Sequence, residues 1–595
     1  MATSLLATTC ASSVVAPRPY RVAVVGAGVA GAACASRLLQ LSPNNLAVRI
    51  YDQGARGPGG RACPRPVDGK GASFSPDDKG GGAPVPGLSF DHGVQAVQVS
   101  NPAVQAAVDG WVADGIAAEW RGTFGELEGG IFRETASEGE TSFCGLAAPR
   151  PRFVGTPSNG AWVEGMLPAN DARLERRWVT KVESIDYEQL DDGEGRWRLR
   201  EAGSGAVYAA DVVVCAGHAA SMVADAALKL PEHLRDGADD ARVSDATLRA
   251  VSYPDGVAPL YALMAAFEGP APVLPFDGAA VVGDEDLAWI SKQSSKPSSP
   301  SSSNAQPEAG EGAEQGEVVV ALSTEAFARR MQARPSHARR ASEEHLSEAA
   351  TELLGSLARA LGLPAAGKEG GSGGALPATR YVHAQRWAAG LTRSPLGLSP
   401  PRALWRDAGL VGCGDWAGTA ARFEQAVLSG WAAADAVAEV AAAAATNRAL
   451  LSVERATAVQ VEAAAAWPVW SCEAWQPPAA AGGCGGGGAA AAAAGAGADD
   501  GTEAASPAVG RFQESRWWEA RPGVGEERCH VFEGRATLLP QGGGAPVEIG
   551  AGDWVTFRVG FQCEWVVTAP ISKRYAYYCE DGSEWEGKSY GQELP

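Results

Sequence analysis

The sequence predicts an α/β protein. We expect a dinucleotide-binding domain of the Rossmann type with an interleaved mixed β-sheet domain, followed by a small all-β barrel. Three observations predict this fold. Within residues 21–61, a strand, a glycine-rich turn, a helix and a second strand ending in an acid follow one another. A further buried strand and a helix follow at residues 410–440. After residue 510 the sequence changes to tryptophans, short apolar strands and glycine turns.

The glycine-rich turn follows a short apolar strand at residues 22–25 and has the spacing G-x-G-x-x-G. Its glycines are Gly26, Gly28 and Gly31. The first allows a tight turn, the second lets a pyrophosphate approach the backbone, and the third lets helix and strand pack closely. Val29 and Ala30 lie at the helix N-terminus, where free N–H groups stabilise phosphate charge.

The second strand, residues 47–51, ends on Asp52, which is followed by Gln53. An acid at this point can accept hydrogen bonds from the ribose hydroxyls of a dinucleotide. The glycine spacing alone is weak evidence in a chain with 74 glycines. The ordered series of strand, glycines, helix, strand and acid is much stronger. It predicts dinucleotide binding, and the alternative is a purely structural βαβ unit.

Composition excludes some functions. The net charge of −20 argues against nucleic-acid binding and against binding to an anionic membrane surface. No run of apolar residues is long enough to predict a membrane span. The eleven cysteines show neither C-x-x-C nor zinc-ligand spacing, which favours a reducing compartment and predicts no metal site. Composition does not determine the oligomeric state.

Residues 1–19 are rich in Ala, Ser and Thr and contain Arg18, and the first acid in the chain is Asp52. This composition is typical of a plastid transit peptide and predicts a chloroplast location. The alternative is a disordered tail of a cytoplasmic protein.

Composition also predicts the domain boundaries. We expect the dinucleotide-binding and sheet domains within residues 20–440, with a disordered insertion at 291–316. An Ala/Gly-rich linker is expected over residues 441–510 and the barrel over 511–595. The tract at 479–506 reads as a flexible tether with a reach of roughly 30 Å, so the barrel need not contact the cofactor site.

The segment after Asp52 narrows the choice of cofactor. Gly59, Gly60 and Arg61 form a second glycine pair with an arginine. Here the chain resembles the renalase-like, amine-oxidase-type FAD-dependent oxidoreductases. That resemblance covers roughly residues 20–440 and implies FAD as the cofactor. It also implies that the second glycine pair and Arg61 approach the flavin and its pyrophosphate.

Two further segments resemble the same family. The strand that begins at Val182 resembles the one whose valine backbone lies over adenine. The segment with Gly414 and Asp415, together with the helix containing Ala426, resembles the closing strand and helix, where an aspartate meets the ribityl chain or the pyrophosphate. For Asp415 alone, the alternative is a helix N-cap.

The resemblance implies hydride transfer from a small substrate to FAD. The substrate would be an amine or a reduced pyridine nucleotide, and NAD(P)H could act as the reductant. A non-enzymatic flavin-binding sensor or interaction protein is the alternative. No catalytic acid or base stands out. His92 and His383 are the best-placed histidines, but structural roles are expected for both. Cys413 is expected to be a buried core thiol.

The last domain resembles the small cupins of the ureidoglycine-aminohydrolase type. The positions that correspond to cupin metal ligands are Glu527, Cys529, Glu533 and Cys563. No histidine occupies them, and His530 would point to the other face of its strand. We therefore expect a metal-free accessory barrel. The alternative is a bifunctional enzyme with a cupin aminohydrolase.

Overall fold

The computed structural model describes residues 19–41, 46–54, 57–68, 84–135, 143–188, 197–217, 220–269, 273–297, 316–334, 342–363, 375–420, 422–474, 509–513, 521, 523–541 and 546–585. The expected transit peptide at 1–19 therefore lies almost wholly outside the described residues, as does the tract at 479–506. His218 and His337 also lie outside them.

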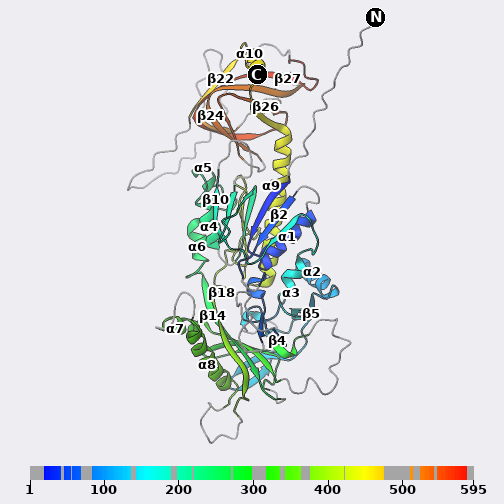
Figure 1. Cartoon of the computed structure of the whole chain (residues 1–595), viewed down its shortest axis with the longest axis vertical. Coiled ribbons are helices and arrows are strands. Elements are labelled where there is room, and N and C mark those ends of the chain that lie inside the picture. Colours follow the sequence, from blue (N-terminus) through cyan, green and yellow to red (C-terminus); the bar gives the residue numbers. More distant parts are fainter. Residues whose placement is uncertain are drawn as a thin grey trace.

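A six-stranded sheet forms the centre of the molecule (Figure 1), in the order β19-β20-β13-β1-β2-β9. All neighbours are parallel except β19 and β20. The strands are β1 (Tyr20–Val25), β2 (Leu46–Tyr51), β9 (Leu174–Arg177), β13 (Val212–Ala216), β19 (Ala403–Trp405) and β20 (Leu410–Cys413). The predicted Rossmann-type architecture is confirmed.

Strand β1 is buried on both faces, as a central parallel strand must be. Val22 and Val24 belong to one hydrophobic cluster, and Ala23 and Val25 to another. The first cluster holds α1 (Val29–Leu41), α2 (Pro102–Ala113), α3 (Ala161–Met166) and α9 (Phe423–Leu450). The second cluster includes residues of α4 (Ala220–Ala227), α5 (Glu232–Arg235) and α6 (Asp245–Ala250), and of the sheet β10 (Val182–Tyr187), β11 (Trp197–Glu201) and β12 (Val207–Ala210).

The interleaved domain is a seven-stranded sheet in the order β18-β14-β17-β16-β15-β6-β7. Its strands are β6 (Phe124–Glu128), β7 (Ile131–Glu134), β14 (Val257–Phe267), β15 (Gly278–Val281), β16 (Leu287–Lys292), β17 (Val318–Ser323) and β18 (Thr379–Thr392). Helices α7 (Glu325–Gln332) and α8 (Glu343–Ala360) cover one face. The other face packs on the segments of β3 (Arg65–Asp68), β4 (Pro84–Phe90) and β8 (Phe153–Gly155), and β8 pairs with β5 (Ala117–Glu119).

The predicted insertion at 291–316 begins later than expected. Residues 291–297 are described and complete β16, followed by a short 3-10 turn, η3 (Gln293–Ser295). Ser291 and Gln293 are buried and hydrogen-bonded to each other. The Ser-rich composition hid this segment, because its polar side chains are satisfied inside the protein. The insertion proper, residues 298–315, lies outside the part described.

The C-terminal domain is all β, with α10 (Ala458–Ala464) beside it, and the predicted barrel is confirmed. Its strands are β21 (Leu451–Arg455), β22 (Val469–Ala474), β23 (Val509–Gln513), β24 (Val524–Pro540), β25 (Val547–Gly550), β26 (Asp553–Arg558) and β27 (Cys563–Cys579). Its sheet has the order β21-β26-β24-β27-β22-β23, with β25 on β24.

The boundary predicted at residue 511 is wrong. Helix α9 runs without a break to Leu450, and the chain then enters the barrel directly through β21. Strand β21 pairs with β26, and β22 pairs with β27. The tract at 479–506 thus lies between two strands of the barrel and does not connect two domains. Alanine is the strongest helix former, so the Ala-rich run that suggested a linker instead extends α9.

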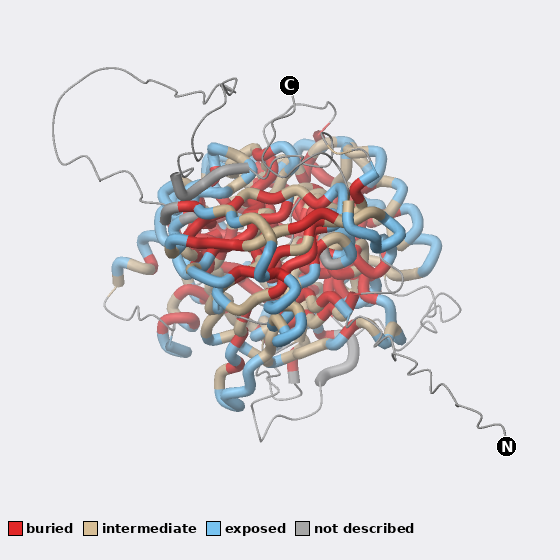
Figure 2. The backbone as a smooth tube through the Cα atoms, turned by 90° about the horizontal axis from the view of Figure 1, so that it is seen from above, coloured by how far each residue is buried: buried red, intermediate tan, exposed pale blue. Residues whose placement is uncertain are grey.

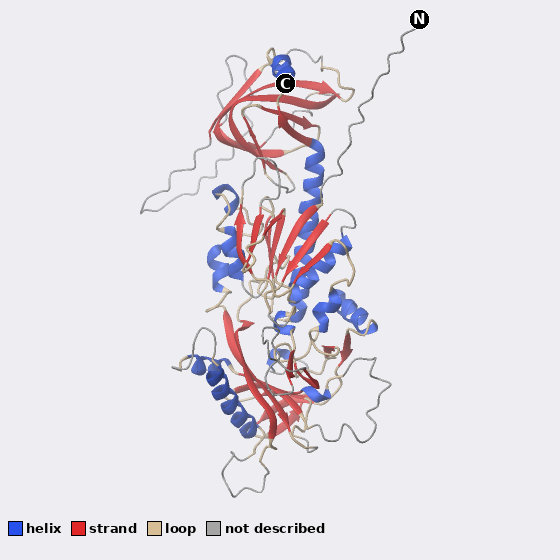
Figure 3. Cartoon of the chain, viewed as in Figure 1, coloured by secondary structure: helices blue, strands red, loops and turns tan. Residues whose placement is uncertain are grey.

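Barrel and Rossmann-type domain are also packed together. Leu539 of β24 and Val566 of β27 belong to the buried cluster that contains Trp197 and Val213. The barrel lies at one end of the central sheet, and the seven-stranded sheet lies at the other (Figures 1 and 3). Seen from above, buried residues fill the middle of the molecule and exposed residues surround them (Figure 2).

Helix α9 contains one stretch, Phe423–Thr446, that is long and apolar enough to cross a membrane. Half of its apolar window is buried inside the protein, as in a core helix. At Gly430, a Cβ would stand 2.3 Å from the Ala30 carbonyl oxygen of α1. The two helices therefore approach each other closely at Gly430, and buried α9 residues such as Val427, Ala433 and Val437 belong to the core cluster that contains α1.

The boundary can be tested with two fragments. A fragment from residue 447 to 595 contains all seven barrel strands, and we expect it to unfold cooperatively on heating. A fragment from 511 to 595 lacks β21 and β22, and leaves the edges of β26 and β27 unpaired. We expect this shorter fragment to aggregate or to show no cooperative transition by circular dichroism. An equally stable shorter fragment would contradict the assignment of the two strands to the barrel.

Candidate functional site

The site lies at the carboxyl ends of the parallel strands. Gly26 follows β1, Asp52 follows β2, Gly217 follows β13 and Gly414 follows β20. In open α/β sheets, ligands bind in the crevice outside these ends. The topology therefore brings together residues that are nearly 400 positions apart in the sequence.

The structure gives a different steric environment at each of the three motif glycines. A Cβ on Gly26, where φ is +110°, would stand 1.9 Å from the Ala216 carbonyl oxygen. A Cβ on Gly31 would stand 1.9 Å from the Gly26 carbonyl oxygen. A Cβ on Gly28 would meet no protein atom within 4 Å. Gly26 and Gly31 are thus required by packing, whereas the space beside Gly28 is open to a ligand.

Helix α1 starts at the open side of this loop. The Gly28 carbonyl accepts the first helical hydrogen bond, from Ala32, at 2.9 Å. Val29 and Ala30 therefore lie in the first turn, whose N–H groups have no acceptor within the helix. This end carries the positive pole of the helix dipole, which favours the negative charge of a pyrophosphate.

Asp52 holds the loop as well as facing the site. Its carboxylate oxygens accept hydrogen bonds from the N–H groups of Ala27 (3.1 Å) and Gly54 (2.7 Å). Burial raises the pKa of Asp52, and these two hydrogen bonds oppose the shift. Each carboxylate oxygen has a second lone pair, so the predicted contact with ribose hydroxyls is sterically consistent. Gln53 beside it is exposed.

The second glycine pair lies against the first. The Gly59 N–H donates to the Ala27 carbonyl at 2.8 Å, and a Cβ on Gly60 would stand 3.8 Å from the Cα of Gly28. Gly59 and Gly60 both have positive φ, +124° and +54°. The chain therefore folds back over the dinucleotide loop, which directs Arg61 toward the last strand.

Arg61 joins the two ends of the predicted site. Its guanidinium forms an ion pair with Asp415 at 2.9 Å and donates to the Gly390 carbonyl at 3.0 Å. The Asp415 side chain is 4% exposed and that of Arg61 is 27% exposed. The other Asp415 oxygen, Oδ1, is buried and has no hydrogen-bond partner among the described residues. A buried carboxylate oxygen without a donor is costly, and a ligand hydroxyl would satisfy it.

Gly414 directly precedes Asp415, and Ala426 lies on α9, the helix that follows it. Gly414 has a φ of +158° and its N–H donates to Ser429 Oγ on α9 at 2.9 Å. Ala426 is buried in the first turns of α9. The closing strand is thus joined to α9 at Gly414, and α9 packs at Gly430 on α1, the helix that follows the first glycine loop.

Val182 begins β10 and is only partly buried. The chain reaches it directly from the site, since the Thr180 N–H donates to the Asp52 carbonyl at 2.7 Å. It lies on the adenosine side of the predicted site, two residues beyond that contact.

The two candidate histidines line the boundary between the central sheet and the seven-stranded sheet. The His92 ring is fully buried and lies tilted against Trp387 of β18, with the ring centres 5.0 Å apart. His383 Nε2 lies 3.0 Å from a guanidinium nitrogen of Arg65. A guanidinium only donates, so His383 Nε2 accepts and the ring is neutral in this arrangement. Both geometries agree with structural roles.

The sequence did not point to a buried Lys–Asp pair next to this region. Lys296 Nζ lies 2.9 Å from Asp91 Oδ2, and both side chains are less than a tenth exposed. Burial lowers the pKa of Lys296, and the Asp91 carboxylate opposes the shift. Gln95 continues the polar cluster, donating to the Asp91 carbonyl and accepting from Ser291. Lys296 fell within the predicted insertion, so no sequence signal marked it.

Cys413 is fully buried, and burial raises its pKa well above the ordinary value. A protonated, buried thiol is a poor nucleophile. The expected role as a core residue is consistent with this environment.

In the barrel, the predicted ligand positions do not converge. Glu527 and Cys529 are buried neighbours, with Sγ 3.1 Å from Glu527 Oε1. Glu533 is exposed and accepts a hydrogen bond from Ser572. His530 lies outside the buried cluster of the barrel, which contains Cys529 and Val531. Among the described residues, no group of three or more potential metal ligands is found. Lys573 approaches Glu527 instead, at 2.9 Å.

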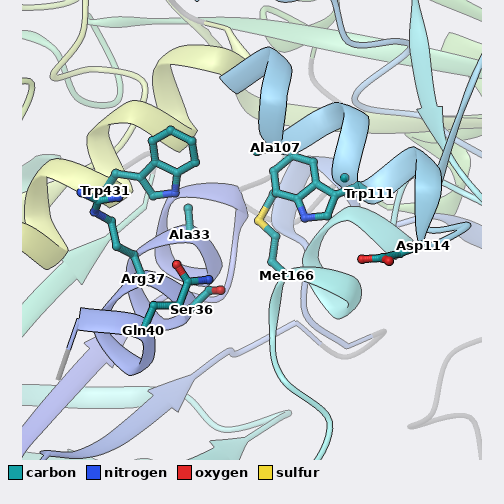
Figure 4. A pocket seen from close by; sticks show the side chains of 10 residues that line it. Ala33, Ser36, Arg37, Gln40, Ala107, Trp111, Asp114, Met166 and Trp431 are labelled. Carbon is teal, nitrogen blue, oxygen red and sulfur yellow. The ribbon is translucent and has the colours of Figure 1, made fainter. Parts of the chain in front are cut away.

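One cavity of about 280 Å³ lies away from the predicted cofactor site, on the outer side of α1. Trp111 of α2 and Trp431 of α9 stand on its two sides, and Arg37 of α1 lies beside Trp431 (Figure 4). Arg37 pairs with Asp435 of α9 at 2.7 Å. The cavity contains none of the predicted cofactor residues.

Two known protein families match parts of the chain. The NAD(P)-binding Rossmann-like domain matches residues 24–111, and the EutQ-like cupin domain matches residues 514–575. The chain therefore contains a nucleotide-binding Rossmann-like segment and a cupin segment. Neither match spans half of the chain. The ureidoglycine type of cupin is not the type that matches. A search of curated proteins found no match.

Solved structures that match parts of this chain include an oxidase, an FAD-containing monooxygenase and a DUF861-family protein. A redesigned putrescine oxidase is 12% identical and covers 71% of this chain and 100% of its own, with a TM-score of 0.37. An FAD-containing monooxygenase from Photorhabdus luminescens is 14% identical over 71% of this chain and 89% of its own, at 0.35. A DUF861-family protein from Thermotoga maritima is 19% identical over 22% of this chain and 99% of its own, at 0.14. With these identities and TM-scores, no cofactor or substrate transfers from them to this chain.

Two substitutions distinguish Gly31, which packing requires, from Gly28, which borders open space. We expect Gly31→Ala to destabilise the protein by about 3 kcal/mol, because its Cβ meets backbone that cannot move away. Gly28→Ala places its Cβ in open space and should cost about 1 kcal/mol or less, the loss of a permissive N-cap residue. Urea unfolding measures both changes. Equal destabilisation by the two variants would contradict the assignment of open space beside Gly28.

Proposed function

We propose that this protein is an FAD-dependent oxidoreductase that takes a hydride from a small amine or a reduced pyridine nucleotide. The observation that carries the proposal is the buried Asp415 Oδ1, which has no donor among the described residues and lies beside the open glycine loop. A plain mononucleotide half-site would not need this second anchor. When bound, FAD would supply the acceptor for the hydride and pass the electrons to oxygen or another acceptor.

The residues present fit such a cofactor. The open face of Gly28 and the first turn of α1 suit a pyrophosphate, and Asp52 suits ribose hydroxyls. Arg61 and Asp415 hold each other in place, so Asp415 is orientated before any ligand arrives. Asp415 Oδ1 would then be free to accept a hydrogen bond from a ligand hydroxyl, such as one on the ribityl chain of a flavin.

The substrate would approach from the seven-stranded sheet. Strand β18 presents Tyr381, His383, Gln385 and Trp387 at alternate positions toward the segment of β4 and Arg65. Arg65 donates to Gln385 and His383, which fixes both side chains. The Trp387 ring lies against the His92 ring, with the ring centres 5.0 Å apart. Polar and aromatic side chains of this kind suit a small molecule.

The family description that matches residues 24–111 supports a nucleotide and makes NAD(P) itself the second candidate. In that case the pyridine nucleotide would be the resident cofactor and not a substrate. The order of the two glycine pairs and the anchor at Asp415 favour FAD. A flavin-binding sensor without turnover is the alternative with the same cofactor.

The experiment is a flavin assay on the purified full-length chain. We expect a yellow protein that releases FAD on denaturation, and Gly28→Val should lose the flavin while remaining folded, because its side chain would fill the open space beside the loop. Val112→Ala, at an exposed position on α2, is a matched control that should keep it. A colourless wild type that takes up no added FAD would refute the proposal.

Reduction of the bound flavin distinguishes an oxidoreductase from a flavin-binding sensor. Under anaerobic conditions, the flavin should bleach on addition of at least one member of a panel of small amines, NADH and NADPH. Flavin that is retained but bleached by no member of the panel would favour the sensor. Stoichiometric NAD(P) in place of FAD would favour the second candidate.

A further inference from the structure

The cavity of about 280 Å³ on the outer side of α1 is not used by the flavin proposal. Helix α2 contributes one face to it, because its lining residues repeat at the spacing i, i+3, i+4 and i+7. They are Ala107, Gly110, Trp111 and Asp114. Trp431 of α9 stands on the opposite side from Trp111 (Figure 4). The volume is at the low end of the range for small-molecule sites, so the cavity suits a small ligand.

Gly110 leaves this space open, and the stability of α2 does not account for it. Apart from the backbone of α2 itself, a Cβ at this position would meet no described atom within 4 Å. Gly110 lies inside the helix, where glycine costs about 1 kcal/mol relative to alanine. Neither close packing nor helical geometry requires a glycine here. What the residue provides is room in the wall of the cavity, next to Trp111.

Asp114 gives the cavity a negative charge that the helix does not need. It caps the C-terminal end of α2, where the helix dipole is negative and a carboxylate is unfavourable. The last turn of α2 has no basic residue to offset this charge. Among the described residues, none forms an ion pair or a hydrogen bond with the Asp114 carboxylate. The carboxylate is therefore available to a cation in the cavity.

The other charged residue of the cavity is already neutralised. Arg37 donates from Nε to Asp435 Oδ1 at 2.7 Å and from Nη2 to Oδ2 at 3.2 Å. The net charge of the lining is therefore that of Asp114. Trp111 and Trp431 are both only partly buried, and indole rings attract cations more strongly than other aromatic side chains do. Charge and aromatic lining both favour an organic cation as the ligand.

We propose that this cavity is a binding site for a small organic ammonium ion that carries an aromatic or branched apolar group. The ammonium group lies beside Asp114 and Trp111, where the C-terminal dipole of α2 also favours a positive charge. The apolar group lies toward Trp431 and the buried Met166. The charge of Asp114 disfavours an anion of the same shape. The site is independent of the flavin proposal, because no predicted cofactor residue lines it.

The test is isothermal titration calorimetry of the full-length chain with benzyltrimethylammonium chloride. The nitrogen of this ion has no lone pair, so the proposed flavin reaction does not oxidise it to an imine. We expect saturable binding of one ion per chain, with a dissociation constant below about 1 mM. Phenylacetate and benzyl alcohol carry the same ring without the positive charge, and should bind at least about tenfold more weakly.

Two variants test the lining. Gly110→Leu fills the cavity and should abolish saturable binding, while its melting temperature stays equal to or above that of the wild type because leucine is the better helix former. Asp114→Asn removes the charge and should weaken binding about tenfold. Asp109→Asn is the matched control, because Asp109 is an exposed acid of the same helix that does not line the cavity, and it should bind as the wild type does.

Wild-type protein that shows no saturable binding below about 1 mM would overturn the proposal. So would phenylacetate that binds as tightly as the ammonium ion, or binding that persists in Gly110→Leu. If Gly110→Leu does not fold, the two acid variants decide the question. Equal affinity of Asp114→Asn and Asp109→Asn for benzyltrimethylammonium would then overturn the assignment of Asp114 as the group that binds the cation.

Discussion

The ion pair between Arg61 and Asp415 is the interaction on which the site depends. It joins the turn after the first βαβ unit to the last strand of the central sheet. It adds to the core of the sheet and to the contact of α9 with α1 at Gly430, which also connect the two halves of the site. Because Asp415 is almost fully buried, loss of Arg61 would leave an uncompensated charge, which costs far more than a surface pair contributes. The pair also fixes which carboxylate oxygen remains for a ligand.

Helix α9 extends this constraint to the rest of the molecule. Its first turns carry Ala426 beside the site, Gly430 packs on α1, and its last residue leads directly into the barrel. The helix has 28 residues and no break. The position of the barrel is therefore set by the same helix that closes the cofactor site, and the contact of Leu539 and Val566 with the core reinforces it. The barrel is a docked domain and not a tethered one.

Much of the site could be predicted from the sequence, because its residues act through local backbone geometry. The glycine spacing, Asp52 and the pair Gly59 and Gly60 each impose a conformation that the sequence encodes nearby. The family resemblance placed Arg61 and Asp415 at the same cofactor, but their ion pair was not predicted, since a contact across some 350 residues leaves no local signal. The resemblance to renalase-like enzymes remains a proposal about the substrate.

The barrel contains strand pairings and contacts that could not be predicted from the sequence. Strands β21 and β22 are short and border Ala- and Gly-rich segments, so composition masked their pairing with β26 and β27. The tryptophans at 467 and 470 were the only local sign of a folded segment. Lys573 was missed because the search followed the spacing of metal ligands, whereas a lysine reaches Glu527 from a different strand. The two come together because β24 and β27 are neighbouring strands of the barrel, and that pairing cannot be predicted from local sequence.

The most direct test of the account is the affinity of the apo-protein for FAD in Asp415→Asn, measured by flavin fluorescence. Asp435→Asn, which removes an acid on α9 that is paired with Arg37 and lies outside the site, is the matched control. Loss of a charged hydrogen bond at Oδ1 should weaken binding by about 2 kcal/mol, or roughly thirtyfold. The control should bind as the wild type does. Unchanged affinity in Asp415→Asn would contradict a cofactor site built from both ends of the chain.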